Sequence, residues 1–341
     1  MRILVTGNLG YAGPVVMRHL HARWPDAVLL GFDAGWFAPG GAGLPCTQHR
    51  GDVRDIDASL LAGVDAVVHL AAVSNDPLGD RFTAATGEIN GTATLRLASL
   101  AAACGVRRFV FASSCSVYGA GGTAARRECD AARPLTEYAR SKLAAEAGLL
   151  RLATPEMAVT CLRFATACGA SEHLRLDLVL NDFVAGALAT GRIVLRSDGT
   201  PWRPLIDVQD MARAIGWAIA RDVAAGGAAL VVNAGQDAAN YRVADLARAV
   251  AAALPGTQVA LNPAAAPDSR SYRVDFALFR SLAPADQPQV ALEASIAGLA
   301  GALRACPSPP AAVRLHALAD LQAAGRLGCD LRWLEGHALA A

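Results

Sequence analysis

Residues 2–13 read RILVTGNLGYAG and carry the features that decide the fold. An apolar, β-branched start predicts a short strand, and Gly7, Gly10 and Gly13 follow it. Residues 14–20 predict the first turns of a helix, and their leading proline suits a position whose backbone N–H has no partner. Strand, glycine turn and helix in this order form the frame that a dinucleotide requires, with its pyrophosphate at the helix amino terminus.

The next predicted strand ends in the acidic residue that such a site needs. Residues 27–32 are apolar and lead into Asp33, which lies 20 residues after Gly13. A carboxylate at this offset binds adenosine ribose hydroxyls and repels a 2′-phosphate, so the sequence favours NAD as the cofactor. The glycine spacing and Asp33 each have another explanation when they are considered alone. Glycine triplets arise by chance in a chain with 32 glycines, and Asp33 could be a solvated strand end.

Strands and helices alternate along the chain, which predicts an α/β fold. The predicted strands are 65–72, 108–112, 157–164, 192–196 and 230–234, and the predicted helices are 56–61, 87–104, 137–153, 177–190 and 211–220. We expect a Rossmann-type doubly wound parallel sheet with a smaller C-terminal substrate-binding lobe. The NAD-binding Rossmann domain would span 1–170, with 205–235 returning to it. The lobe would comprise 171–204 and 236–300, followed by a helical C-terminal extension over 301–341 to which we assign no chemistry.

Composition narrows the class of protein. The chain of 341 residues is 53% apolar and 18% charged with net charge +1, which argues against disorder, nucleic-acid binding and a membrane surface. No apolar run reaches transmembrane length, and the chain opens directly into its first strand without room for a signal peptide. Eight scattered cysteines without a Cys-x-x-Cys pair predict reduced thiols in a cytoplasm and no metal site.

Tyr138 and Lys142 are four residues apart on a predicted helix, so their side chains share one face. A phenol titrates near pKa ~10, too high for a base at neutral pH. A neighbouring ammonium and a positively charged nicotinamide would stabilise the phenolate and lower that pKa. Ser114, at the end of the preceding predicted strand, could hold a substrate hydroxyl in line. The pattern therefore predicts proton transfer coupled to hydride transfer.

Ligands of open parallel sheets bind beyond the carboxyl ends of the strands. Residues 70–72 are apolar or small there and would let a cofactor approach, and 73–77 form the loop that follows. Asp52 and Val53 lie where a carboxylate and a backbone donor could meet an adenine, although a loop aspartate without a role is equally compatible with the sequence.

Taken together and in order, these motifs resemble the extended short-chain dehydrogenases/reductases of the nucleotide-sugar epimerase/dehydratase type, over about residues 2–280. The resemblance implies that Ser114 orients the sugar hydroxyl, Tyr138 is the base, and Lys142 is its electrostatic and ribose-binding partner. It implies these cofactor contacts: Gly7, Gly10, Tyr11, Ala12, Gly13, Asp33, Asp52, Val53, Leu70, Ala71, Ala72, Asn90, Ser113, Tyr138 and Lys142. It implies these substrate contacts: Ser74, Asn75, Ser114, Cys115, Ser116, Asn181, Arg203 and Arg270.

The resemblance implies that Arg203 and Arg270 bind the diphosphate of a nucleoside-diphosphate sugar, and guanidinium forks do match phosphate oxygens. The alternative for each arginine is a surface ion pair.

The chain also departs from the family pattern. Sugar 4,6-dehydratases carry an acidic pair where this chain has Cys115 and Ser116, so the general acid and base for removing water are missing. Pro204 replaces an aspartate and Asp207 a histidine or tyrosine of many relatives, which leaves the identity of the sugar open. Cys115 has two interpretations, an acid/base as in some 3,5-epimerases or a buried packing thiol.

The resemblance implies a cytoplasmic NAD-dependent nucleotide-sugar epimerase acting at C4 through a transient 4-keto sugar, with no nucleic-acid or membrane partner. The alternatives are a dehydratase or ketoreductase of the same family and, from another class, a non-catalytic NAD(P)-sensing binding protein. Relatives commonly form homodimers through two helices, here 87–104 and 137–153, and their alanine-rich faces suit a buried four-helix contact.

Overall fold

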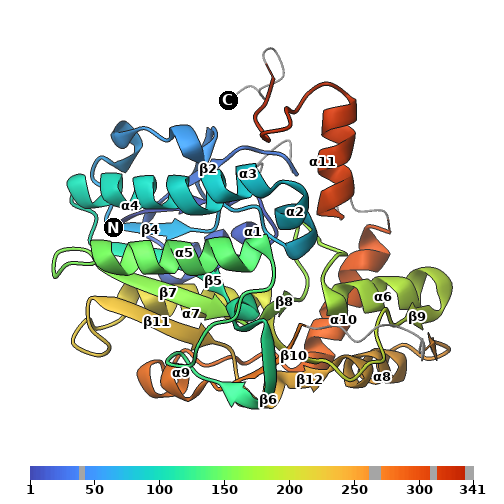
Figure 1. The fold of residues 1–341 in the computed structure, drawn as a ribbon. Helices are drawn as coiled ribbons and strands as arrows, with labels where there is room; N and C mark the ends of the chain where they lie inside the picture. The colour runs from blue at the N-terminus through green and yellow to red at the C-terminus, as the bar shows by residue number, and fades with distance from the viewer. Residues whose placement is uncertain (38–42, 261–269, 308–312, 335–341) are drawn as a thin grey trace.

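The computed structural model describes residues 1–37, 43–260, 270–307 and 313–334. Their centre is a sheet of seven strands in the order β11-β7-β5-β4-β1-β2-β3, with every neighbouring pair parallel (Figure 1). The strands are β1 (Arg2–Thr6), β2 (Val28–Asp33), β3 (Thr47–Arg50), β4 (Ala66–His69), β5 (Arg108–Ser114), β7 (Ala158–Phe164) and β11 (Ala229–Ala234). This is the predicted Rossmann-type sheet.

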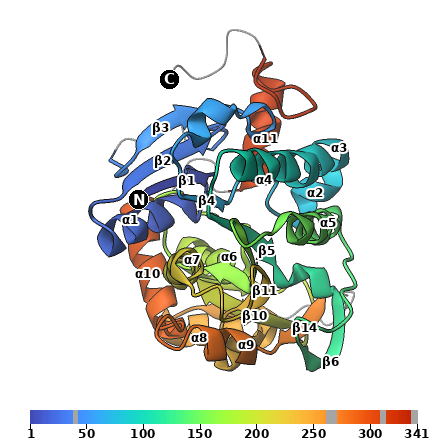
Figure 2. The same cartoon turned by 90° about the vertical axis from the view of Figure 1, so that its left-hand side faces the viewer.

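Helices cover both faces of the sheet (Figure 2). On one face lie α1 (Gly13–Arg23) and α7 (Val208–Ala220), and on the other lie α4 (Thr94–Ala103) and α5 (Glu137–Leu152). Successive strand residues point to opposite faces, so Ile3 and Val5 join the core beneath α1 and α7, whereas Leu4 joins the core beneath α4 and α5. Burial on both faces explains why these strands read as continuous apolar runs.

The smaller lobe holds a third core cluster. Three strands form its mixed sheet, β8 (Thr166–Cys168), β10 (Trp202–Asp207) and β12 (Asn240–Arg242). Two strand pairs accompany it, β9 (Arg192–Val194) with β13 (Gln258–Ala260) and β6 (Ala120–Arg126) with β14 (Ser271–Val274). The helices around them are α6 (Val179–Thr190), α8 (Val243–Ala253) and α10 (Leu292–Ala305), whereas α9 (Ala277–Leu282) packs against β11 of the central sheet.

Short elements complete the described chain. They are η1 (Val53–Asp55), η2 (Ala58–Leu61), α2 (Asp76–Arg81), α3 (Thr83–Thr86), η3 (Gly87–Ala93), η4 (Cys115–Tyr118), η5 (Asp237–Ala239) and α11 (Arg314–Ala323). Within the described ranges, no helix is long and apolar enough to cross a membrane.

Several sequence predictions need correction. The helix predicted at 56–61 is only a 3₁₀ turn, η2, and the helix predicted at 87–104 begins with the π-helical η3 before α4. The polar stretch before Pro134 contains β6, a strand that was not predicted and that pairs with β14. β8 and the end of β10 lie within the ranges predicted for the Rossmann domain, and they pair with each other in the small three-stranded sheet.

Candidate active site

The glycine turn between β1 and α1 is closed by backbone contacts. Gly7 has φ +74°, and a Cβ there would lie 2.5 Å from the Ala71 backbone nitrogen. A Cβ on Gly13 would lie 2.1 Å from the Asn8 carbonyl oxygen. Only glycine fits either position, so the loop can approach a pyrophosphate closely. The α1 amino terminus has no side-chain cap, which leaves its N–H groups for such a ligand.

A cavity of about 1110 Å³ opens beside this turn. It lies beyond the carboxyl ends of β1, β2, β4 and β5, as an open α/β sheet requires. The predicted site residues that line it are Gly7, Gly10, Tyr11, Ala12, Gly13, Asp33, Asp52, Val53, Leu70, Ala71, Ala72, Ser74, Asn75, Ser113, Ser114, Ser116, Tyr138, Lys142, Arg203 and Arg270. Segments that are far apart in the sequence therefore meet at a single site.

Three predicted contacts do not line the cavity, and each is fully buried. Asn90 bonds both backbone groups of Val73 and so fixes the loop after β4. Asn181 accepts a hydrogen bond from the Gly169 N–H at 3.2 Å and donates to a backbone carbonyl. Cys115 donates to the Arg163 carbonyl oxygen at 3.1 Å. In this structure Asn90, Asn181 and Cys115 thus support the surrounding chain, and their contacts with cofactor or substrate stay predictions.

Asp33 is positioned by two backbone donors. Its Oδ2 accepts from the Leu9 N–H at 3.0 Å and its Oδ1 from the Gly35 N–H at 2.7 Å. Burial raises the pKa of the Asp33 carboxyl, and the two hydrogen bonds oppose that rise. The carboxylate is therefore fixed at the end of β2 beside the glycine turn, where it fits an adenosine ribose.

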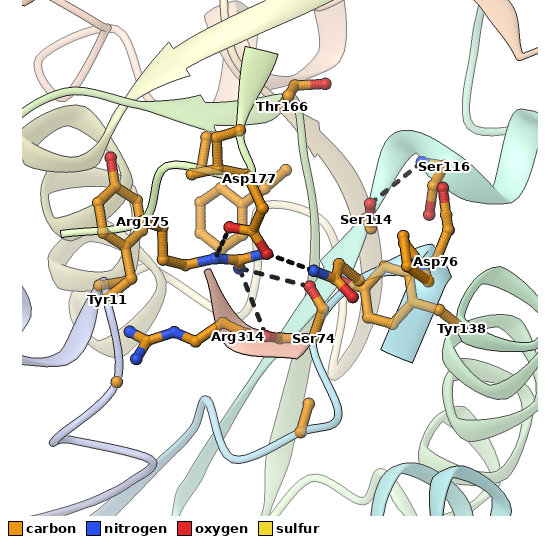
Figure 3. A pocket seen from close by; sticks show the side chains of 18 of the residues that line it. Tyr11, Ser74, Asp76, Ser114, Ser116, Tyr138, Thr166, Arg175, Asp177 and Arg314 are labelled. Carbon is orange, nitrogen blue, oxygen red and sulfur yellow. Dashed lines mark hydrogen bonds and ion pairs between the residues drawn. The ribbon is translucent and has the colours of Figure 1, made fainter. Parts of the chain in front are cut away.

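Tyr138 and Lys142 lie in the first turns of α5, whose amino terminus is capped by Thr136. Burial and the negative charge of Asp76 raise the pKa of Tyr138 to about 12, while a hydrogen bond with Ser114 lowers it. Without a cofactor the phenol is therefore neutral at physiological pH. Ser114 and Tyr138 together present a hydroxyl pair to the cavity, as Figure 3 shows.

Lys142 is the only lysine among the 31 lysine and arginine residues of the chain. Its Nζ donates to the Ala112 carbonyl oxygen at 2.8 Å and lies 5.8 Å from the centroid of the Tyr138 ring. Burial lowers the pKa of Lys142 to about 7, against the opposing effect of Glu146. Every other member of this set of residues is an arginine, and position 142 alone has the compact ammonium of a lysine. This choice indicates that the site needs a point charge beside the phenol.

The pKa of Lys142 can be measured directly because no other lysine contributes a signal. We expect the lysine side-chain resonance of isotopically labelled, cofactor-free protein to titrate near pH 7, not near ~10.4 as in an unfolded chain. Between these values the unfolded chain binds more protons at this residue, so the Lys142 contribution to the unfolding free energy rises with pH. Lys142→Met should remove that rise. Titration near the unfolded value would contradict the burial argument.

A buried ion pair supports this part of the site and was not predicted from the sequence. The Arg163 guanidinium contacts the Glu146 carboxylate at 2.7 Å, and Glu146 also accepts from the Ser113 hydroxyl. Arg163 donates further to the Tyr118 oxygen at 3.0 Å. The pair thereby ties the end of β5 to the helix that carries Tyr138 and Lys142.

A second unpredicted cluster lies across the cavity (Figure 3). Arg175 forms a bidentate pair with Asp177, at 2.9 and 3.1 Å. Asp177 also accepts from the Asn75 amide, and Arg175 donates to the Ser74 hydroxyl at 3.3 Å. Asp76, on the Tyr138 side, accepts from Thr136 and pairs with Arg270 at 2.8 Å. Ser74 and Asn75 are thus placed by a segment a hundred residues away.

Fold and site together are those of a dinucleotide-binding α/β enzyme, with a serine, a tyrosine and a lysine at the wall of one cavity. The sequence profile of the NAD dependent epimerase/dehydratase family matches residues 3–235. The match covers more than half of the chain, which therefore belongs to this family of NAD-dependent enzymes. The resemblance, the fold class and the NAD cofactor predicted from the sequence are confirmed at that level.

The individual relatives include both epimerases and dehydratases. The chain is 35% identical to a UDP-glucose 4-epimerase of Streptomyces lividans over 42% of its own length and 45% of that protein, so this match spans about half of the relative. It is 30% identical to a dTDP-glucose 4,6-dehydratase of Streptomyces griseus, over 62% and 68% of the two chains. The structure of MoeE5 in complex with UDP-glucuronic acid and NAD matches with a TM-score of 0.78 and 28% identity, over 89% and 99%.

Proposed function

We propose that the chain is an NAD-dependent epimerase of a nucleoside-diphosphate sugar that acts at C4 through a transient 4-keto sugar. The observation that carries the proposal is the meeting of Ser114, Tyr138 and Lys142 at the wall of a cavity that also contains the glycine turn. Ligand pockets commonly measure about 300–1,000 Å³. A cavity of about 1110 Å³ is large enough to hold a dinucleotide and a nucleotide sugar together.

NAD, when bound, would supply the hydride acceptor, held by the glycine turn, Asp33, Asp52 and Lys142. The chain supplies the proton chemistry. The Ser114 hydroxyl orients the sugar hydroxyl, and the Tyr138 oxygen takes its proton. The Lys142 ammonium stabilises the phenolate, since an opposite charge favours the ionised form. After the keto sugar has rotated in the cavity, so that its other face is presented, Tyr138 returns the proton.

Arginines at the lobe side of the cavity support a diphosphate as the anchor of the substrate. Arg203 and Arg270 both line the cavity, and Arg270 is held by Asp76. Their guanidinium groups match phosphate oxygens. An anchored diphosphate leaves the sugar free to rotate, which a 4-epimerase requires because the hydride must return to the opposite face.

The residues between Ser114 and Val117 favour epimerisation over loss of water. Cys115 is buried away from the cavity, and burial raises the pKa of its thiol well above the ordinary value. Ser116 lines the cavity with a hydroxyl that finds no hydrogen-bond partner within the described chain. Neither residue supplies the acid and base of an elimination. A dehydratase is the second candidate, favoured by Asp76, a carboxylate that acts electrostatically on Tyr138.

The proposal predicts the product of a simple incubation. Purified protein is mixed with a panel of nucleoside-diphosphate sugars without added cofactor, and the products are analysed by mass spectrometry and NMR. We expect an isomer of unchanged mass, with inverted configuration at C4. Loss of one water would establish the dehydratase instead, and turnover only after addition of NADH would indicate a ketoreductase.

We further propose a homodimer in the cytoplasm. α4 and α5 lie side by side (Figure 1), with Gly148 packed closely against Leu95. Their outer surface carries small exposed side chains such as Ser99, Ala144 and Ala147, which suit close helix packing across a two-fold axis. All eight cysteines are free thiols, in keeping with a reducing compartment. Light scattering distinguishes the dimer from the monomer.

A further inference from the structure

Residues 313–334, to which the sequence assigned no chemistry, form part of the cofactor cavity. We call this segment the C-terminal cover. Residues 313–316 line the cavity. Leu318 and Leu331 are buried in the same core cluster as Leu30 of β2. The cover is therefore built into the Rossmann core, and α11 lies at the edge of the molecule in contact with α2 (Figure 1).

The cover is anchored on two sides of the expected adenosine site. The Trp333 Nε1 donates to the Ala34 carbonyl oxygen at 2.6 Å, next to Asp33. Arg54 donates to the Asp330 carbonyl oxygen at 2.9 Å, next to Val53. Ala34 directly follows Asp33, which is assigned to the ribose, and Arg54 directly follows Val53, which is assigned with Asp52 to the adenine. An adenosine bound there would lie against the cover.

Arg314 brings a positive charge to this place. Its side chain is buried, with 2% of the residue exposed, and its guanidinium lies 4.0 Å from the centroid of the Phe37 ring. It donates to the His173 carbonyl oxygen at 3.4 Å. Two residues earlier, Ser171 donates to the Tyr11 carbonyl oxygen of the glycine turn at 2.6 Å. Arg314 is therefore linked through one short loop to the turn that receives the pyrophosphate.

The electrostatic surroundings of Arg314 favour an anionic ligand. Burial, and then the charge of Arg175 as a second buried cation of the same cavity, lowers the pKa of Arg314 to about 9. The negative charges of Asp33 and Asp177 oppose this effect. Phosphate oxygens match a guanidinium fork, and a pyrophosphate would place its negative charge beside both arginines.

We propose that Arg314 binds an oxygen of the cofactor's pyrophosphate and that the C-terminal cover encloses the adenosine half of NAD. The proposal rests on the cofactor of the proposed function and not on the sugar reaction. An epimerase regenerates NAD in every cycle, so an enclosed cofactor need not leave between turnovers.

Binding of fragments to cofactor-free full-length protein tests the role of Arg314. Calorimetry compares NAD, ADP and adenosine for wild type, Arg314→Met and Arg314→Lys. A hydrogen bond to a charged group corresponds to a loss of about 10- to 100-fold in affinity. We expect that loss for NAD and ADP with Arg314→Met, partial recovery with Arg314→Lys, and unchanged affinity for adenosine. Arg304→Met, at an exposed position of α10, is the matched control.

Equal losses for ADP and adenosine would show a merely structural arginine and overturn the proposal, as would unchanged binding of all three ligands. Failure of wild-type protein to bind NAD would instead refute the cofactor of the proposed function. A protein that binds NAD but turns over no sugar would leave the role of Arg314 supported.

Hydrogen exchange tests the cover separately. In the full-length protein, NAD should slow amide exchange within residues 314–323, because an adenosine packed beneath α11 restrains its opening. We expect the same protection with ADP, and less with Arg314→Met at equal ligand concentration. Exchange that NAD leaves unchanged over this helix would overturn the cover.

Discussion

Replacing Tyr138 by phenylalanine is expected to lower kcat about 10²- to 10⁴-fold, the range that general acid–base catalysis contributes. The substitution removes one oxygen and leaves the ring that packs beside Lys142. The glycine turn and Asp33 are untouched, so NAD bound per chain should stay constant. Initial rates with the active sugar, together with the NAD released on denaturation, measure both quantities.

Tyr241→Phe is the matched control, because Tyr241 lies in the lobe and does not line the cavity. It should retain the wild-type rate. A Tyr138→Phe enzyme with more than a tenth of the wild-type kcat would show that another group takes the proton, and Asp76 would be the next residue to replace.

Replacing Arg163 by methionine is expected to lower the free energy of unfolding by about 3–5 kcal/mol, as when one partner of a buried ion pair is removed. The side chains of Arg163 and Glu146 are 7% and 3% exposed, so the Glu146 carboxylate would remain buried without its partner. Urea unfolding of cofactor-free protein measures the change. Activity should fall as well, because the pair ties Ser113 to the helix of Tyr138.

A surface pair provides the control for this effect. Arg140 and Glu137 are 51% and 23% exposed, and Arg140→Met should cost no more than about 1 kcal/mol. Combining Arg163→Met with Glu146→Leu should recover much of the loss, since no unpaired charge remains. A loss below about 1 kcal/mol for Arg163→Met alone would mean that water or another cation reaches Glu146.

The central sheet could be predicted from the sequence because its strands are buried on both faces. Ile3 and Leu4 face different cores, and both must be apolar, so the strand appears as an uninterrupted apolar run. The cofactor turn and the Tyr138–Lys142 pair could also be predicted from the sequence, because each depends on the spacing of residues within one local element. β6 has no such signature and was missed.

Other site residues depend on contacts between distant segments. The Arg314 side chain donates a hydrogen bond to the backbone of His173, which lies 141 positions away in the sequence. No local sequence pattern predicts such a contact. Asn90 and Asn181 show a second limit of sequence reasoning. An amide side chain can bind a ligand or the protein itself, and only the fold shows that these two form hydrogen bonds within the chain. One available signal was overlooked, namely that Lys142 is the only lysine of the chain.

The most direct test of the account follows hydrogen at C4 of the substrate. The sugar nucleotide that reacts in the panel is prepared with deuterium at C4 and incubated with the enzyme in ordinary water. We expect a C4 epimer that keeps its deuterium, because the same hydride leaves one face and returns to the other within a single site. Deuterium lost to the solvent, or a product lighter by one water, would contradict it.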